Sequence, residues 1–387
     1  MLLRQFSPHG GLELYAHKLV EGLLEKGVQV TVVCQENSSE LLAKGLKFKF
    51  IEKSGSARSK HSRLLSLHKN ANDALSTIED VDLVHSQHCP SSGADLVTFH
   101  NHTSKRLSEV GLWWEKALND NKRNFVPAYR LKDLHDEELV RRALCLIFPA
   151  EVMKEDFFSA FPFLQGPPAK PYVIAHPGAS LSTTTNLQND KTSPNQQEPF
   201  NFLFVGRGFR KKGLDILFAA CCILKKKSSR KFTLSIAGLS AKPADKLRMN
   251  LLGLNDCVNY LGFQKDMESV YSRAQAIILP SRVEPFGMAP VQGMQRGLVP
   301  IVSRVSGVAE VLHDGQDALI LQDHLNAEEL ANLMAKLMTD DALLKRLSSS
   351  AILTAEKVSW DETVSQTLKA YEIALGLKSS SQKSMSK

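Results

Sequence analysis

The side chains best suited to chemistry in this chain of 387 residues lie in its second half. Glu284 follows an apolar run that ends at Leu279, and a bend at Gly287 leads into a segment predicted to form a short helix. The start of a helix points free N–H groups and the positive end of the helix dipole at whatever lies before it, which favours an anion. An anion site beside a carboxylate suits a ligand that is part phosphate and part polyol, such as a nucleotide sugar. An ordinary strand, loop and helix with a solvated Glu284 explains the same residues equally well.

The first half offers a pair of glycines and a pair of histidines. Gly10 and Gly11 stand in a loop between a short apolar strand and a helix, and His100 and His102 follow an apolar run. Ligands of α/β proteins bind at the C-terminal ends of parallel strands, and a double glycine lets a ligand approach the backbone closely. Either histidine could contact a substrate or move a proton. A tight turn and two hydrogen-bonded structural histidines remain the alternatives, and the three-glycine fingerprint of a nicotinamide cofactor is missing.

Strands and helices alternate in both halves. Residues 1–35 form a strand, a glycine-bearing loop, a helix and a strand, which is a βαβ unit of a parallel sheet. Further predicted strands lie at residues 82–85, 95–100, 144–148, 172–178, 202–205, 232–237, 258–261, 276–279 and 299–302. The first strand, residues 1–3, is short for a central position in a sheet. We therefore predict an α/β protein with two Rossmann-like, doubly wound domains that face each other.

The length of the chain also favours two domains. Residues 179–199 are polar and nearly free of apolar side chains, so we place a linker there. We predict an N-terminal domain at residues 1–178, the linker at 179–199 and a C-terminal domain at 200–358. A last helix at residues 360–376 should pack back on the first domain, and residues 378–387 should form a disordered tail.

Composition limits the protein class. The hydrophobic fraction of 43% is that of a globular protein with a core, and no apolar run reaches the length of a membrane span. The N-terminus lacks a secretory signal, and the six cysteines contain no C-x-x-C pair. We expect a cytoplasmic protein. The net charge of +7 permits peripheral binding to an anionic membrane face. The mixture of aromatic and basic residues at 105–130 suits such a membrane face, but it would also suit an acceptor-binding cleft or a helix whose aromatic residues are part of the core.

Five short motifs in this order resemble the family-four retaining glycosyltransferases, which have the GT-B fold. The matching stretches are residues 8–11 (PHGG), 205–207 with 212–213 (VGR and KG), 284–287 (EPFG), 296–300 (RGLVP) and 307–310 (GVAE). The resemblance covers nearly the whole chain, and the lipopolysaccharide core glucosyltransferases are the nearest group that it suggests. It implies two facing Rossmann-like domains.

The resemblance also implies roles for residues of the second domain. Arg207 and Lys212 look like the family's pair that binds the donor diphosphate. The guanidinium group of an arginine and the ammonium group of a lysine both suit phosphate oxygens, so no metal or cofactor is expected. Glu284 corresponds to the first acid of the family's E-x7-E motif and would contact hydroxyls of the donor sugar. Gly287 and Met288 would supply backbone N–H groups beside it.

The chain departs from the family pattern at the second acid of that motif, where it carries Gln292. An amide offers one acceptor oxygen and one donor group where a carboxylate accepts two bonds, so Gln292 would bind the ribose with altered affinity. In the first domain, Gly10 and Gly11 would lie against the diphosphate, and His100 or His102 near the sugar and the acceptor. The family is thought to use a same-face displacement in which the leaving phosphate takes the proton of the acceptor.

The resemblance therefore implies transfer of a hexose from a UDP-glucose-like donor to a glycan or glycolipid acceptor, for which the lipopolysaccharide core is a candidate. No nucleic acid partner is expected for such an enzyme. Two alternatives stay open. One is a nucleotide-sugar 2-epimerase of the same fold, which would form product from the donor alone. The other is a non-catalytic basic module that binds a membrane or nucleic acid on a decayed transferase fold.

Overall fold

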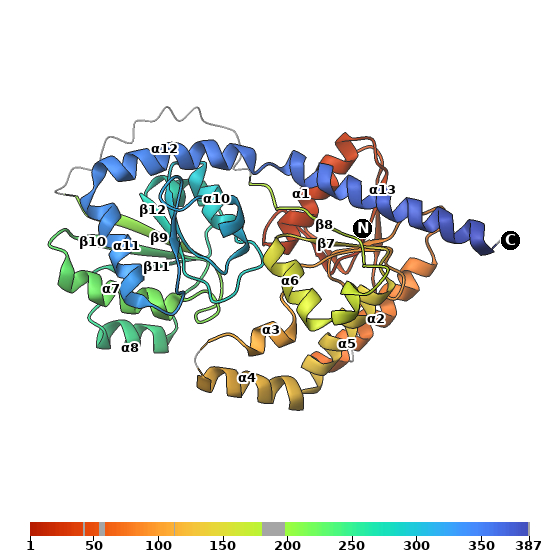
Figure 1. Ribbon diagram of the computed structural model, residues 1–387, viewed down its shortest axis with the longest axis horizontal. Helices are drawn as coiled ribbons and strands as arrows, with labels where there is room; N and C mark the ends of the chain where they lie inside the picture. Colours follow the sequence, from red (N-terminus) through yellow and green to blue (C-terminus); the bar gives the residue numbers. More distant parts are fainter. Residues whose placement is uncertain (42, 54–58, 112, 180–197, 386–387) are drawn as a thin grey trace. The chain divides into compact units, whose positions relative to one another are not determined.

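A computed structural model describes residues 1–41, 43–53, 59–111, 113–179 and 198–385 of the chain (Figure 1). The chain divides into two compact units. The first contains Met1–Gly178 together with Trp360–Lys387, and the second contains Ala179–Ser359. The last helix thus belongs to the first unit. Most of the predicted linker, residues 180–197, lies outside the described residues.

A parallel sheet forms the centre of the first unit. Its strands are β2 (Val30–Cys34), β4 (Leu46–Phe50), β5 (His85–Ser86), β6 (Leu96–Thr98), β7 (Cys145–Phe148) and β8 (Tyr172–Ile174). The pairs are β2 with β4 and the series β5-β6-β7-β8, and every pair is parallel. The short strands β1 (Gln5–Phe6) and β3 (Glu36–Asn37) pair separately.

Residues 1–3 were expected to be too short for a central position, and this was wrong. Leu2 bridges Val33 of β2 on one side and Ser86 of β5 on the other. Its N–H donates to the carbonyl of His85 at 2.8 Å, and its own carbonyl accepts from the N–H of Gln87 at 2.8 Å. On the β2 side, the N–H of Leu3 donates to the carbonyl of Val33 at 3.0 Å, and the N–H of Val33 donates to the carbonyl of Met1 at 2.8 Å. Three residues with satisfied backbone bonds are thus enough to join the two parts of the sheet.

Helices surround this sheet. They are α1 (Leu12–Glu25), α2 (Lys60–Ser76), α3 (Ser104–Ser108), α4 (Trp113–Phe125), α5 (Pro127–Arg142), α6 (Glu151–Ala160), the 3₁₀ turn η1 (Pro162–Gln165) and α13 (Trp360–Met385). One core cluster packs the rings of Phe99, Phe148 and Phe157 between β6, β7 and α6. Another joins α1 to α13, where a Cβ on Gly22 would lie 2.5 Å from Val364. The close fit fixes α13 on the first unit.

The predicted disordered tail, residues 378–387, is instead largely helical, because α13 continues to Met385 (Figure 1). Lys378 donates to the carbonyl of Asp82 at 2.8 Å and forms an ion pair with Asp95. The hydroxyls of Ser379 and Ser380 donate to carbonyls one turn earlier at 2.9 and 2.8 Å. The polar composition suggested disorder, but these contacts and the absence of proline let the helix run on.

The second unit contains one parallel sheet of six strands. They are β9 (Phe200–Val205), β10 (Phe232–Ala237), β11 (Val258–Gly262), β12 (Ala276–Leu279), β13 (Val299–Ser303) and β14 (Leu319–Leu321), in the order β11-β10-β9-β12-β13-β14. Its helices are α7 (Leu214–Lys227), α8 (Pro243–Leu251), α9 (Met267–Ser272), α10 (Met288–Met294), the 3₁₀ turn η2 (Gly307–Val311), α11 (Ala327–Thr339) and α12 (Asp341–Lys357). The fold is doubly wound, as predicted.

The strand order of the second unit indicates where a ligand would bind. The chain runs outward from β9 to β11, returns to the centre at β12, and then runs outward on the other side. The loops that follow β9 and β12 therefore diverge from neighbouring strand ends. Such a switch point is where doubly wound sheets bind their ligands.

Candidate functional site

The loops after β9 and β12 are tied together by one buried arginine. Arg282 donates two bonds of 2.7 Å to the carboxylate oxygens of Asp215, at the start of α7, and a third of 2.6 Å to the carbonyl of Arg210. The forked pair is the strong, geometrically specific form of an ion pair. It fixes the basic glycine-rich loop, residues 206–213, against the turn that follows β12.

Gly213 brings the two loops into contact. A Cβ at this position would lie 1.9 Å from the carbonyl oxygen of Pro280, and the φ angle of +72° is in the left-handed region. Only glycine fits both demands. The close approach places the ammonium group of Lys212 in an ion pair with the carboxylate of Glu284. Two predicted donor-site residues, 72 positions apart in sequence, therefore meet at the switch point.

The backbone around Glu284 holds the carboxylate in place. The N–H of Gly307 donates to the carbonyl of Glu284 at 3.1 Å, and that of Val308 donates to the carbonyl of Phe286 at 2.7 Å. Gly287 has a φ angle of +100°, and a Cβ there would lie 2.8 Å from Leu279. It directly precedes Met288, where α10 starts without a side-chain cap. The predicted bend and helix start thus lie beside the carboxylate.

Arg207 and Gln292 are the remaining predicted residues of this unit. Arg207 is exposed, and within the described part of the chain no ion pair or hydrogen bond is seen for its side chain. Gln292 on α10 is half-buried, and its Oε1 accepts a 3.0 Å bond from the hydroxyl of buried Tyr271. The Gln292 oxygen therefore accepts one bond already, and its second lone pair and the amide N–H₂ are the groups left to bind a ligand. Sequence reasoning missed Tyr271, which lies 21 residues away without a motif.

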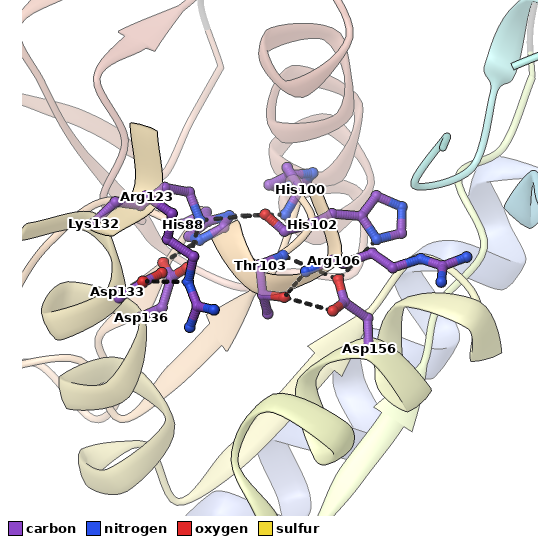
Figure 2. A network of polar contacts seen from close by, with 10 residues as sticks. All are labelled: His88, His100, His102, Thr103, Arg106, Arg123, Lys132, Asp133, Asp136 and Asp156. Carbon is purple, nitrogen blue, oxygen red and sulfur yellow. Dashed lines mark hydrogen bonds and ion pairs between the residues drawn. The ribbon is translucent and has the colours of Figure 1, made fainter. Parts of the chain in front are cut away.

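In the first unit, the loop after β6 presents a histidine oriented by a carboxylate (Figure 2). Nδ1 of His102 lies 2.8 Å from Oδ2 of Asp156, and the N–H and hydroxyl of Thr103 donate to the same carboxylate at 3.0 and 2.5 Å. Because a carboxylate accepts, Nδ1 carries a proton, and in the neutral ring Nε2 then has the lone pair. Nε2 is buried and has no hydrogen-bond partner among the described residues. A histidine in this arrangement can accept a proton or a hydrogen bond.

His100, the predicted catalytic histidine, makes contacts within the first unit. Its Nε2 lies 2.8 Å from the amide oxygen of Gln87, and its ring packs edge-on against Tyr15. Burial lowers the pKa of His100 well below its usual value, and the neighbouring rings of His88 and His85 act in the same direction. The ring is neutral with one nitrogen engaged, whereas His102 presents a nitrogen with no partner in the described chain.

The predicted glycine pair lies at the start of α1. Gly10 has a φ angle of +111°, and a Cβ there would lie 2.3 Å from the Glu13 carboxylate. Gly11 precedes the first residue of α1, and no atom lies within 4 Å of where its Cβ would be. The turn thus requires glycine at position 10. The backbone at position 11 is uncovered within the described chain, which leaves room for a ligand.

The aromatic and basic segment of the first unit forms α4, and its aromatic side chains are not core residues. Trp113 is 81% exposed and Phe125 is 80% exposed, and Leu118 between them is also exposed. The predicted segment includes Leu112, which lies outside the described residues.

Membrane spans and metal clusters were sought over the same described residues. No helix there is long and apolar enough to cross a membrane. In that part of the chain, no group of three or more His, Cys, Asp and Glu side chains is arranged to hold a metal ion. The residues at the candidate sites are suited to hydrogen bonding and charge neutralisation.

Comparisons with known proteins agree with this geometry. The family model described as "Glycosyltransferase Family 4" matches residues 9–177, and the one described as "Glycosyl transferases group 1" matches residues 186–354. A D-inositol 3-phosphate glycosyltransferase of Actinosynnema mirum is 25% identical over 397 residues, which cover 94% of this chain and 92% of the relative. One of Thermobifida fusca is 26% identical, and that match spans 51% of this chain and 49% of the relative.

Solved structures share the fold over nearly the whole chain. WaaG, a glycosyltransferase involved in lipopolysaccharide biosynthesis, is 18% identical with a TM-score of 0.75, over 96% of this chain and 98% of that one. Sucrose-phosphate synthase of Thermosynechococcus elongatus is 18% identical with a TM-score of 0.74, over 96% and 94%. Anabaena HepE, solved with UDP-glucose, has 16% identity, a TM-score of 0.63, and coverage of 95% and 98%. The chain therefore belongs to the group 1 glycosyltransferases of GT-B fold, which its two Rossmann-like units had already indicated.

Proposed function

We propose that this glycosyltransferase moves a hexose, with retention of configuration, from a UDP-glucose-like donor to a glycan or glycolipid. The observation that carries the proposal is the Lys212–Glu284 pair at the switch point of the second unit, held there by the close approach of Gly213 to Pro280. A cation for the diphosphate and a carboxylate for sugar hydroxyls are the two groups that a nucleotide sugar needs.

Lys212 and Arg207 would bind the diphosphate. Lys212 is paired with Glu284, so a diphosphate would compete for the ammonium group and release Glu284 to accept bonds from sugar hydroxyls. The exposed guanidinium of Arg207 adds a second cation. Both charges stabilise the negative charge that grows on the leaving diphosphate.

The chemical step of the proposal is a same-face displacement. The bond between C1 of the sugar and the β-phosphate oxygen breaks, and a bond from C1 to the acceptor oxygen forms on the same face. The acceptor proton passes to the departing phosphate oxygen, so the products are a nucleoside diphosphate and an α-linked glycoside. Positioning and charge stabilisation supply the rate enhancement.

His102 would hold a sugar or acceptor hydroxyl during this step. Its Nδ1 is fixed by Asp156, and its Nε2 has no hydrogen-bond partner among the described residues; in the neutral ring this nitrogen has the lone pair. A hydroxyl that donates to Nε2 is oriented, and its oxygen becomes more nucleophilic. His100, with Nε2 engaged by Gln87, would support the same loop.

The acceptor proposal rests on α4. Exposed Trp113, Leu118 and Phe125 share this helix with exposed Lys116 and Lys122, a combination that suits the headgroup region of an anionic membrane. A lipid-linked glycan such as the lipopolysaccharide core would be reached from that surface. Cosedimentation should occur with vesicles that contain phosphatidylglycerol and not with pure phosphatidylcholine. A Trp113→Ala/Phe125→Ala variant that still sediments equally well would refute this part.

A nucleotide-sugar screen tests the proposed function. UDP-glucose or a related donor at about 100 times its Kd should stabilise the folded chain by about 2.7 kcal/mol, seen as a rise in Tm of several degrees. Sugar should then reach a glycan acceptor, and no epimer should form when donor is present alone. An epimer without acceptor would identify a 2-epimerase instead, and binding of vesicles without any nucleotide sugar would favour the non-catalytic module.

A further inference from the structure

His88, just after β5, has an unusual backbone and a fixed tautomer. Its φ angle is +54°, in the left-handed region that residues with a Cβ rarely adopt. Its Nδ1 accepts from the backbone N–H of His100 at 3.2 Å, and its Nε2 lies 3.0 Å from Oδ1 of Asp136. Because a backbone N–H only donates and a carboxylate only accepts, the ring must be neutral with its proton on Nε2.

Asp136 on α5 joins this histidine to a lysine. Its second oxygen pairs with the ammonium of Lys132, and the same ammonium donates to the carbonyl of His102 at 3.3 Å. Burial raises the pKa of Asp136, but the charge of Lys132 and the hydrogen bonds from Lys132 and His88 outweigh burial and lower the pKa overall. The carboxylate is thus ionised and holds two partners at once.

Both partners of Asp136 bind the backbone of the same loop. His88 accepts the N–H of His100, and Lys132 donates to the carbonyl of His102, so the loop is held at two points, two residues apart. On the other side, Asp156 from α6 holds the His102 ring and the N–H of Thr103. Figure 2 shows the two carboxylates on opposite sides of this loop.

We propose that Asp136, acting through His88 and Lys132, positions the His102 imidazole for sugar transfer. The inference rests on the proposed function, in which His102 holds a reacting hydroxyl. Asp136, His88 and Lys132 are positioning residues, because they contact the loop rather than a substrate. We call them the α5 clamp.

Two features favour a positioning role over simple stabilisation. A buried ion pair contributes little net stability compared with apolar packing, so its presence calls for another explanation. The rings of Phe99 and Phe157 meet His88 edge-on, with centroid distances of 4.9 and 6.2 Å, and hold the ring in the plane that aims Nδ1 at His100. A strained backbone kept in place by packing and hydrogen bonds is typical of functional sites.

Asp136→Asn tests the clamp, because one carboxylate oxygen becomes an N–H₂ that repels either Lys132 or the Nε2–H of His88. Its matched control is Asp133→Asn on the same helix, where Asp133 pairs with Arg123 at 3.3 Å and both side chains are partly exposed. We expect Asp136→Asn to lower kcat by about 10- to 100-fold with an almost unchanged KM for the donor. Asp133→Asn should change neither.

Lys132→Met and Lys132→Arg cover the case in which Asp136→Asn fails to fold, because the lysine side chain is partly exposed. Lys132→Met should lose kcat, and Lys132→Arg should recover most of it, since a guanidinium can donate to both partners. Equal kcat values for Lys132→Met, Lys132→Arg and Asp133→Asn would overturn the clamp.

Amide hydrogen exchange separates the clamp from the proposed function. In Asp136→Asn or Lys132→Met, peptides that contain residues 100–103 should exchange faster, with no change in Asp133→Asn. If the wild-type protein transfers no sugar but the Asp136→Asn and Lys132→Met variants still exchange faster at residues 100–103, the transferase proposal is refuted and the clamp stands. Unchanged exchange at residues 100–103 would refute the clamp, whatever the activity.

Discussion

In the second unit the reactive charges are paired with each other, whereas in the first unit the reactive nitrogen has no described partner. Lys212 and Glu284 neutralise one another at the switch point, and a ligand must separate them. His102 is held on one side by Asp156, and its Nε2 has no hydrogen-bond partner among the described residues. Under the proposed function, donor binding would separate the Lys212–Glu284 pair, whereas His102 would keep its Asp156 partner. The two units thus differ in whether a ligand must displace an existing contact.

The largest effect is expected at Lys212, because its ammonium group would exchange Glu284 for the donor diphosphate. Lys212→Met should lower kcat by about 10²- to 10³-fold, since one preorganised charge at the leaving group is lost. Steady-state transfer assays measure it. The neighbouring Lys211→Met is the control and should stay close to wild type. Similar values for the two variants would remove Lys212 from the site.

Acid should weaken the first unit before the second. His85 is fully buried with a pKa lowered to about 3, and His100 is lowered well below its usual value. Below about pH 6.5 the unfolded chain binds protons at both residues and the folded chain does not, so each costs up to about 1.4 kcal/mol per pH unit.

The second unit contains only two of the chain's 12 histidines, His313 and His324. Hydrogen exchange at a series of pH values should therefore show that peptides of the first unit lose protection first as the pH falls below about 6.5. Simultaneous loss in both units, or earlier loss in the second, would contradict this prediction.

A side chain at Gly213 should destabilise the fold more than a side chain at a glycine where only the backbone conformation is strained. Gly213→Ala adds a Cβ that meets the Pro280 carbonyl, whereas Gly208→Ala, at a φ angle of +103°, adds one with no atom within 4 Å. We expect the free energy of unfolding to fall by about 1–3 kcal/mol more for Gly213→Ala than for Gly208→Ala. Urea denaturation of both variants measures it. Equal losses would mean that the two loops do not need this approach.

The smallest effect is expected at Gln292, where the chain departs from its family. Gln292→Glu restores a second acceptor oxygen, while the Tyr271 hydroxyl can still donate to one oxygen. The KM for the donor should fall about three- to tenfold with little change in kcat, because a charged acceptor binds ribose hydroxyls more strongly. An unchanged KM would show that this residue does not touch the donor.

The local sequence indicates the geometry of the second unit's candidate site better than that of the first unit. Lys212 with Gly213, and Glu284 with Gly287, lie in short loops directly after predicted strands, so local pattern was enough to predict that the two loops meet. His102 was a candidate beside His100, but its carboxylate lies 54 residues away, and His88 and Asp136 are 48 residues apart. Such pairings depend on helix packing, for which the local sequence gives no signal.

The same limit explains the other differences. Leu2 lies at the centre of its sheet because Val33 and Ser86 bracket it, and neither neighbour is visible from a three-residue apolar run. The polar end of α13 is ordered by the contact of Lys378 with Asp82 and Asp95, which are close only in the folded chain. In both cases tertiary contacts override the local composition.

The most direct test of the central claim is the configuration of the sugar that the enzyme releases. Water can replace the acceptor, so UDP-glucose should be hydrolysed slowly, and proton NMR before mutarotation reads the anomer. We expect α-glucose to appear first with wild type and Lys212→Met to release far less. β-Glucose as the first product would contradict retaining transfer at this site.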